Sequence, residues 1–343
     1  MGAAAKAARR NLSLAVLFTL LLSAGLAHLA AVDEMDGDMC SDEMMWMIGW
    51  CLDGIGSDEA VADGAALTSA EYVGSFESIN VAGASATRAF GINARGDIVG
   101  SYTDTSGTHG YLRSGGIVTT INYPDAPGHR TTSTEAWGIN PRGDIIGRYT
   151  AAGIPGTHGF LLTRHGTFTD ISMPGHLITL PTKIGASGEI VGCFHDINGL
   201  TDMYGYVQRG TGVMTFKLPS STVPAGSAAM HNGVTPGGEI VVGLTFPTPT
   251  TSRGYVITRG DLTYIDFPGS TFTQVWDVNP AGIIVGQYAL NGRTDGLLVD
   301  ADGYETIRVP GSTMTVVRGI NPQGDVVGVY NDSLGTHGFV MNK

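Results

Sequence analysis

Cysteine, basic residues and long apolar segments are all scarce in this chain of 343 residues. Three cysteines allow at most one intramolecular disulfide and leave one thiol over. Lys and Arg number 19 against 31 Asp and Glu, so the chain has no basic surplus of the kind that binds nucleic acid. Beyond the N-terminal leader, no segment stays apolar for the ~20 residues needed to cross a bilayer. No GxSxG, HExxH or phosphate-cradling glycine motif occurs, so no catalytic motif indicates an enzyme.

Glycine, by contrast, is abundant. The 51 glycines and a hydrophobic content of 42% favour a folded chain with a buried core and many turns. The length suits one large domain or two ordinary ones.

Residues 1–31 have the composition of an export signal. Lys6, Arg9 and Arg10 precede an apolar run that starts at Leu12, and small residues follow near Ala27–Ala31, where a signal peptidase could cut. The sequence therefore predicts a secreted protein, extracellular or periplasmic. The alternative is an uncleaved anchor, because the apolar run is about the ~20 residues needed to span a bilayer. Only in that case do we expect contact with a membrane.

Residues 32–70 form an acidic segment. The leader contributes +3 and this segment −10 to a total of −12, which leaves −5 for the remainder. Such a composition is typical of a solvated tether. In an oxidising compartment Cys40 and Cys51 are predicted to form a disulfide, which leaves Cys193 free. The methionines between them leave two alternatives open: a soft-metal site for Cu(I), or an apolar patch that docks on the main domain or a membrane.

Residues 71–343 repeat one pattern six times. GINPRGDIIGRYT, Gly138–Thr150, returns as GINPQGDVVGVYN at Gly319–Asn331 and, more weakly, at four other places. A period of 42 to 50 residues with several short strands in each copy is typical of a propeller blade. The glycine of the GD or GE turn aligns the copies: Gly96, Gly143, Gly188, Gly238, Gly282 and Gly324.

Each copy predicts four short antiparallel strands. The first strand ends in GIN, and NPRG then has the Asn, Pro and Gly positions of a type I turn. The second strand follows the acidic residue, the third begins with HGF or a similar triplet, and the fourth ends at a proline in most copies. One such sheet is marginal, but sheets packed face to face around an axis bury both faces. The sequence predicts an all-β, six-bladed β-propeller.

The two ends of the repeat region indicate how the ring closes. The last copy stops after its third strand, and the missing fourth strand has its counterpart in SFESINVAG, Ser75–Gly83. We therefore predict that Phe76–Val81 pairs beside Gly338–Met341. Closure of this kind removes exposed sheet edges.

The pattern GIN-x-x-G-[DE]-I-V-G followed by HG[FY][LV] resembles the bacterial extracellular repeats called HAF repeats, over roughly residues 73–343. The match is specific in copies one, two and six. Copies three to five depart from it: Lys183 and Asp277 each replace the leading glycine, and Gly233–Gly243 holds an extra residue. The resemblance implies an exported, propeller-like protein and indicates no particular activity.

Titratable residues repeat with the architecture. His109, His158 and His337 open third strands, where equivalent positions lie more than ~10 Å apart, whereas zinc ligands lie within about 2 Å of one ion. They are predicted to be structural hydrogen-bonders. The repeated acids are predicted to be turn residues: Asp97, Asp144, Glu189, Glu239 and Asp325. No cofactor is predicted, although calcium stays an alternative at residues 196–202 and near Asp104 and Asp332.

The best candidates for a site are positions where the copies differ. Six residues before the alignment glycine the copies have Phe90, Trp137, Thr182, Asn232, Trp276 and Arg318, and two residues earlier Arg88, Glu135, Leu180, Met230, Gln274 and Val316. If they face the mouth of a central channel, they make a polar and aromatic pocket suited to a sugar or another flat ligand. The alternative is that Trp137 and Trp276 are core. The predicted ligand-binding residues are Phe90, Glu135, Trp137, Asn232, Trp276 and Arg318, bordered by the connections Pro124–Thr134 and Pro219–Ala229.

Three functions are compatible with these features. The first is an exported, non-enzymatic propeller, without catalytic residues, that binds a carbohydrate or a protein at the cell surface through the channel mouth. The second is an exported hydrolase of lactonase or glycosidase type, with a calcium-assisted axial site and Glu135, His231, Asp277 and Arg318 converging from first strands. The third is a surface or matrix protein without a small ligand, attached through its tether.

Overall fold

The computed structural model describes residues 70–71, 74–196, 203–218, 228–248 and 251–343, all within one compact body. The predicted leader, the predicted Cys40–Cys51 disulfide and most of the connection Pro219–Ala229 lie outside these residues. Cys193 is free and buried. No helix in the described part of the chain could span a bilayer.

The described residues form 25 strands and one short 3-10 turn at Pro236–Gly238, so the all-β prediction is confirmed. Units I to III comprise β3 (Ala86–Ile92), β4 (Ile98–Asp104), β5 (Gly107–Ser114) and β6 (Ile117–Ile121); β7 (Arg130–Ile139), β8 (Ile145–Ala152), β9 (Ile154–Leu162) and β10 (Phe168–Asp170); and β11 (Ile178–Ile184), β12 (Ile190–His195), β13 (Tyr204–Arg209) and β14 (Gly212–Phe216). Units IV to VI comprise β15 (Met230–Val234), β16 (Ile240–Thr248), β17 (Thr251–Thr258) and β18 (Asp261–Ile265); β19 (Phe272–Val278), β20 (Ile284–Leu290), β21 (Arg293–Asp300) and β22 (Gly303–Ile307); and β23 (Met314–Ile320), β24 (Val326–Asp332), β25 (Gly335–Asn342) and β2 (Ser75–Ile79).

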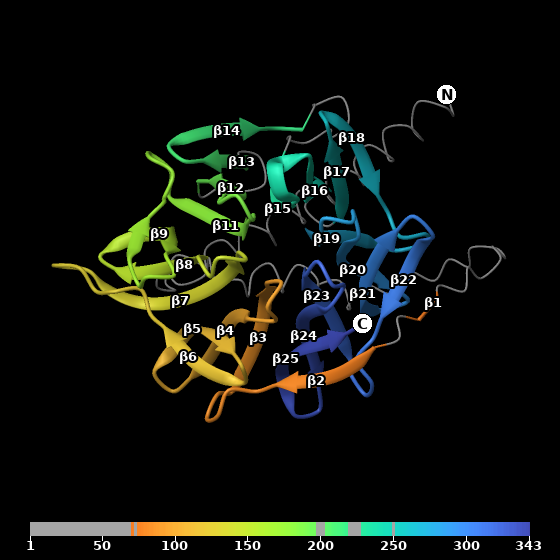
Figure 1. Ribbon diagram of the computed structural model, residues 1–343, viewed down its shortest axis with the longest axis horizontal. Helices are drawn as coiled ribbons and strands as arrows, with labels where there is room; N and C mark the ends of the chain where they lie inside the picture. Colours follow the sequence, from red (N-terminus) through yellow and green to blue (C-terminus); the bar gives the residue numbers. More distant parts are fainter. Residues whose placement is uncertain (1–69, 72–73, 197–202, 219–227, 249–250) are drawn as a thin grey trace, which may run out of the picture. The chain divides into compact units, whose positions relative to one another are not determined.

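Each unit is an antiparallel sheet in which neighbouring strands pair in the order just given. The first strands β3, β7, β11, β15, β19 and β23 gather around the middle of the fold (Figure 1). Each contacts the next, and β23 contacts β3. Single parallel bridges join four of the units into one 16-stranded sheet, while units IV and V are separate sheets of four and five strands. Packing rather than a continuous hydrogen-bond ladder therefore joins the units.

The turn after each first strand explains the repeated Asn and acidic residue. In unit II, Asn140 Oδ1 accepts the backbone N–H groups of Arg142 and Asp144, and its amide donates to the Asp144 carboxylate over 3.0 Å. Burial works to raise the pKa of Asp144, but hydrogen bonds from Asn140 and the Arg164 backbone outweigh it and lower that pKa. The same asparagine-to-aspartate bond occurs in units I and VI. The prediction that these acids are turn residues is confirmed for these units.

Every first strand contains a β-bulge, which inserts one unpaired residue and redirects its side chain. The glycine opposite each bulge allows it, because a Cβ there would overlap the carbonyl oxygen two residues before the bulged residue. These glycines are Gly100, Gly147, Gly192, Gly243, Gly286 and Gly328. The repeated I-V-G triplet therefore encodes the bulge. The bulged residues are Phe90, Trp137, Thr182, Asn232, Trp276 and Arg318, the variable column of the sequence.

We expect Gly328→Ala to lower the free energy of unfolding by about 3 kcal/mol, because overpacking beside backbone cannot relax. The added methyl group would overlap the Val316 carbonyl oxygen and lie 2.7 Å from Phe339 Cε1. Gly212→Ala is the matched control, since the nearest atom to its methyl group is 3.5 Å away. Urea unfolding of both variants checks this, and equal midpoints would contradict it.

A second glycine column forms the seams between units. A Cβ on the third-strand glycine of one unit would touch the residue just before the bulge in the next unit. The six seams are Gly110 with Ala136, Gly159 with Pro181, Gly205 with His231, Gly254 with Val275, Gly296 with Val317 and Gly338 with Ala89. The contact between the last unit and the first is thus of the same kind as the other five.

The N-terminal strand pairs where the sequence predicts. Strand β2 runs antiparallel to β25, with Ser75 opposite Asn342 and Ile79 opposite Gly338. The ring of Phe76 packs edge-on against Tyr330 at 5.6 Å and beside Phe339 at 6.2 Å. A further contact was not predicted: the two-residue strand β1, Ala70–Glu71, pairs in parallel with β22.

Candidate functional site

The six bulged residues form one buried group, here called the bulge layer. All are at most 6% exposed. The rings of Phe90 and Trp137 stack with centroids 4.2 Å apart, and Trp137 lies 6.3 Å from Trp276. Since Trp137 belongs to unit II and Trp276 to unit V, the bulge layer brings together side chains from units that are far apart in the sequence.

Two guanidinium groups cover the indole rings. Arg148 of β8 lies 3.7 Å from the centroid of Trp137, and Arg318 lies 3.7 Å from that of Trp276. Arg318 is also 5.6 Å from the centroid of Trp137. Cation–π contacts of this kind stabilise desolvated rings by about 2 kcal/mol each. Because Phe90 and two arginines occupy ring faces of these tryptophans, a sugar could stack on them only by displacing these groups.

The residues two before each bulge form what we call the entrance layer. Three of its side chains are partly exposed, Arg88, Glu135 and Gln274, whereas the other three are buried and apolar: Leu180, Met230 and Val316. Glu135 accepts a 3.0 Å hydrogen bond from Trp137 Nε1, which links the two layers. Of the residues that the structure describes, these three present the polar groups of the variable columns to solvent.

Each entrance-layer residue faces a partner on the second strand of its unit. Glu135 is directly opposite Arg148 and Arg88 is opposite Ser101. In unit V the amide of Gln287 donates to Gln274 Oε1 over 2.9 Å. Directly opposed side chains on an antiparallel pair lie within contact distance on the same face. The polar character of the entrance layer therefore extends to the second strands of units I, II and V.

A buried ion pair lies beyond the bulge layer. Lys183 of unit III and Asp277 of unit V replace the glycine that follows the bulge in the other units, and their side chains form an ion pair. Asp277 also accepts the backbone N–H groups of Ile320 at 3.0 Å and Val278 at 2.8 Å. Burial raises the pKa of Asp277, and the ammonium group of Lys183 opposes that rise. The two departures from the repeat thus compensate one another.

The residues of the hydrolase hypothesis do not form one group. His231 is 2% exposed in the seam between units III and IV, where its Nδ1 lies 2.7 Å from Tyr255 Oη and its ring packs against Phe216. Burial lowers its pKa to about 4. Asp277 is held by Lys183, while Glu135 belongs to the entrance layer and Arg318 to the bulge layer. His231 is therefore not placed to act as a general acid or base for a reaction beside Glu135.

The third-strand histidines have the structural role that the sequence predicts. His109 bonds to Ser106 Oγ and Asn122 Oδ1, both at 2.8 Å, and His337 bonds to Asn80 and Asp332. Asp104, one of the candidate calcium residues, accepts both the backbone N–H and the hydroxyl of Ser106. Among the described residues no group of three His, Cys, Asp or Glu could hold a metal ion. Residues 197–202 of the third calcium candidate lie outside the described residues.

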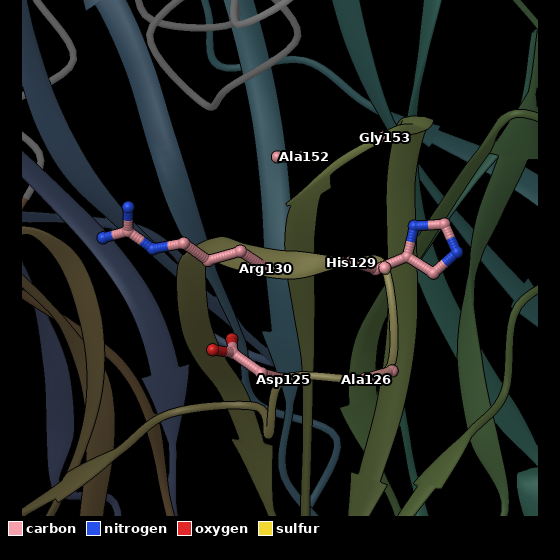
Figure 2. A pocket seen from close by; sticks show the side chains of 7 residues that line it. Asp125, Ala126, His129, Arg130, Ala152 and Gly153 are labelled. Atoms are coloured by element: carbon pink, nitrogen blue, oxygen red, sulfur yellow. The ribbon is translucent and has the colours of Figure 1, made fainter.

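The connection Pro124–Thr134 borders an open cavity of about 460 Å³. It lies between the β6–β7 loop and the β8–β9 turn, lined by Asp125, Ala126, Gly128, His129, Arg130, Ala152 and Gly153. Figure 2 shows Arg130 and His129 pointing to opposite sides of the loop. Asp125 Oδ1 accepts the backbone N–H of Thr131 over 2.8 Å. Arg130 is five residues before Glu135, about 17 Å along β7, so this cavity is separate from the entrance layer.

No protein-family model and no curated protein sequence match the chain. Solved structures that resemble its fold include virginiamycin B lyase from Staphylococcus aureus, with 14% identity and a TM-score of 0.46 over 78% of this chain and 99% of that one. TolB from Acinetobacter baumannii has 14% identity and a TM-score of 0.47, over 76% and 64%. A lectin of Aleuria aurantia in complex with alpha-methyl-L-fucoside has 11% identity and a TM-score of 0.45, over 72% and 87%. Because each TM-score is below 0.5, no activity, ligand or partner is carried over to this chain.

Proposed function

We propose that the protein is an exported six-bladed β-propeller, closed by β2, that binds a carbohydrate or a protein at its entrance layer and catalyses no reaction. Six units with the same kind of seam, and the pairing of β2 with β25, support the closed ring. The predicted export signal and the resemblance to HAF repeats support the extracellular setting. Calcium has no part in this proposal.

One observation carries the binding function. The glycines and turn residues that shape each unit repeat, whereas the side chains of the bulge layer and the entrance layer differ in chemical type from unit to unit. Architecture alone does not require Arg88, Glu135 or Gln274 at partly exposed first-strand positions. Conversely, the burial of Trp137 and Trp276 supports a core role for both rings, so the proposed contact surface is the entrance layer.

A glycan array probed with the full-length protein tests this proposal. We expect binding to at least one glycan class, and we expect the Glu135→Ala, Gln274→Ala double variant to bind about tenfold more weakly, since it removes two hydrogen-bonding groups. Gln323→Ala, an exposed turn residue, is the control and should bind normally. Binding that the double variant retains in full would contradict the site. Cleavage of a bound glycan would contradict the non-enzymatic function.

A further inference from the structure

The outer strand of unit I, β6, has an unprotected edge. Among the described residues β6 pairs with β5 alone, and it lies at the outside of the fold (Figure 1). Ile117 is 71% exposed and Val118 is 39% exposed, and Thr119 and Thr120 are exposed as well. An open edge with exposed β-branched side chains is a template for pairing with another strand.

The fourth strands of the other units have features that natural proteins use to protect such an edge. Strand β22 is covered by β1, and a charged residue lies in or directly after each of the other four. These charged residues are Glu77 in β2, Asp170 in β10, Asp261 in β18 and Lys217 directly after β14. Strand β6 has no charged residue, and the uncharged stretch extends from Ser114 to Pro124. The charges that keep other strands away from an edge are therefore missing at β6.

The hairpin before β6 determines which of its backbone groups face outward. Ser114 and Ile117 close a two-residue loop, Gly115–Gly116, whose φ values of 56° and 81° are those of a type I′ turn. The closing pair of such a hairpin exchanges both of its hydrogen bonds, and bonded and non-bonded pairs then alternate along the strands. Every second residue counted from Ile117 therefore directs its N–H and C=O groups toward β5, whereas Val118 and Thr120 direct theirs outward.

A second copy of β6 fits this edge. Antiparallel pairing about a two-fold axis at Thr119 places Val118 of each copy opposite Thr120 of the other, so the outward backbone groups satisfy one another. Thr119 then faces its own counterpart in a non-hydrogen-bonded pair, where side chains lie closest and threonine pairs are stabilising. The same pairing of β2 or β22 would place a glutamate opposite itself, because Glu77 and Glu305 are at the centres of those strands. Like charges directly opposite one another are destabilising, so β6 suits self-association better than β2 or β22.

We infer that two copies of the protein form a dimer through antiparallel pairing of their β6 strands, which joins unit I of one copy and unit I of the other into one continuous sheet. The five residues of β6 in each copy bury less than the ~1,200 Å² of a stable interface, so the dimer is weak and forms in the micromolar range. Strand β6 lies at the outside of the fold and the first strands gather around its middle, so dimerisation leaves the entrance layer of both copies accessible (Figure 1). The dimer does not depend on the proposed function.

Sedimentation velocity of the full-length protein, from low to high micromolar concentration, tests the inference. We expect a reversible equilibrium between monomer and dimer in the wild type. Thr119→Glu should weaken dimerisation about tenfold, because two carboxylates then meet at the two-fold axis, and Thr119→Lys should weaken it to a similar degree. An equimolar mixture of these two variants should dimerise again, since opposite charges then face each other across the axis.

Met214→Glu is the matched control, because it places the same charge at the centre of β14, another outer strand, at a residue that is 64% exposed. It should leave dimerisation unchanged. Thr119 is exposed, so Thr119→Glu should keep the wild-type thermal midpoint and its loss of dimer reports on the edge. If the wild type stays monomeric, whether or not another protein occupies β6, the inference is overturned. A dimer that survives Thr119→Glu, an equal loss with Met214→Glu, or a mixture of the two charge variants that stays monomeric would also overturn it.

Discussion

Lys183→Met is expected to lower the free energy of unfolding by about 3–5 kcal/mol, because it leaves a buried carboxylate without its cation. Asp277 has a side chain that is 2% exposed, and its remaining partners are the backbone N–H groups of Ile320 and Val278. These two groups already bond to the carboxylate in the wild type and cannot replace the ammonium group. Urea unfolding at pH 7 measures the loss.

The same variant should show a marked pH dependence. Burial raises the pKa of Asp277 above its value in the unfolded chain, so the folded protein holds a proton that the unfolded chain releases. The stabilising contribution of protonated Asp277 is therefore fully present below the pKa of this group in the unfolded chain, about 4. It is lost as the pH rises through the pKa of Asp277 in the folded protein. We therefore expect Lys183→Met to lower the free energy of unfolding, relative to the wild type, by more at pH 7 than at pH 4.

Two controls accompany this measurement. Arg113→Met breaks the partly exposed ion pair with Glu77 and should lower the free energy of unfolding by at most about 1 kcal/mol. Adding Asp277→Asn to Lys183→Met removes the buried charge and should abolish the difference between pH 4 and pH 7. A Lys183→Met protein as stable as the wild type at pH 7 would show that the carboxylate does not depend on Lys183.

Deletion of residues 75–83 is expected to prevent accumulation of soluble folded protein. The deletion removes β2, which pairs with β25 from Ser75–Asn342 to Ile79–Gly338. It also uncovers the Tyr330 and Phe339 rings that contact Phe76, and it exposes the backbone edge of a strand in the last unit. An uncovered strand edge with apolar side chains pairs readily with other chains. Expression of the full-length deletion variant, followed by fractionation and size-exclusion chromatography, measures the outcome.

A deletion of equal length from the acidic segment, residues 53–61, is the matched control. It precedes every described strand and should leave the protein soluble. A soluble, monomeric protein without residues 75–83 that still unfolds cooperatively would contradict the role of β2 in closing the sheet of unit VI.

The repeat made several features predictable because each depends on local chemistry or on a fixed period. The Asn140–Asp144 turn follows from turn-forming residues at set positions, and the pairing of β2 follows from counting strands in the last copy. The variable column at Phe90 and Trp137 was predicted to converge, and the structure brings both rings into one stack.

Other features depend on which strands face each other across the fold, which a repeat pattern does not encode. Lys183 and Asp277 were each recognised as departures from glycine, yet their pairing requires units III and V to meet across unit IV. Arg148 lies on a second strand, outside the variable first-strand columns, so its position over Trp137 was not predicted. Strand β1 has two residues, too few for any periodicity.

The pairing of the first long strand with the last has a consequence for biogenesis. Ser75 and Asn342 are 267 positions apart, so β2 leaves the ribosome long before its partner exists. Contacts between such distant positions form slowly, because a large loop must close first. The sheet of unit VI therefore stays incomplete until strand β25 has been synthesised, so this unit is the last of the six that a growing chain can complete.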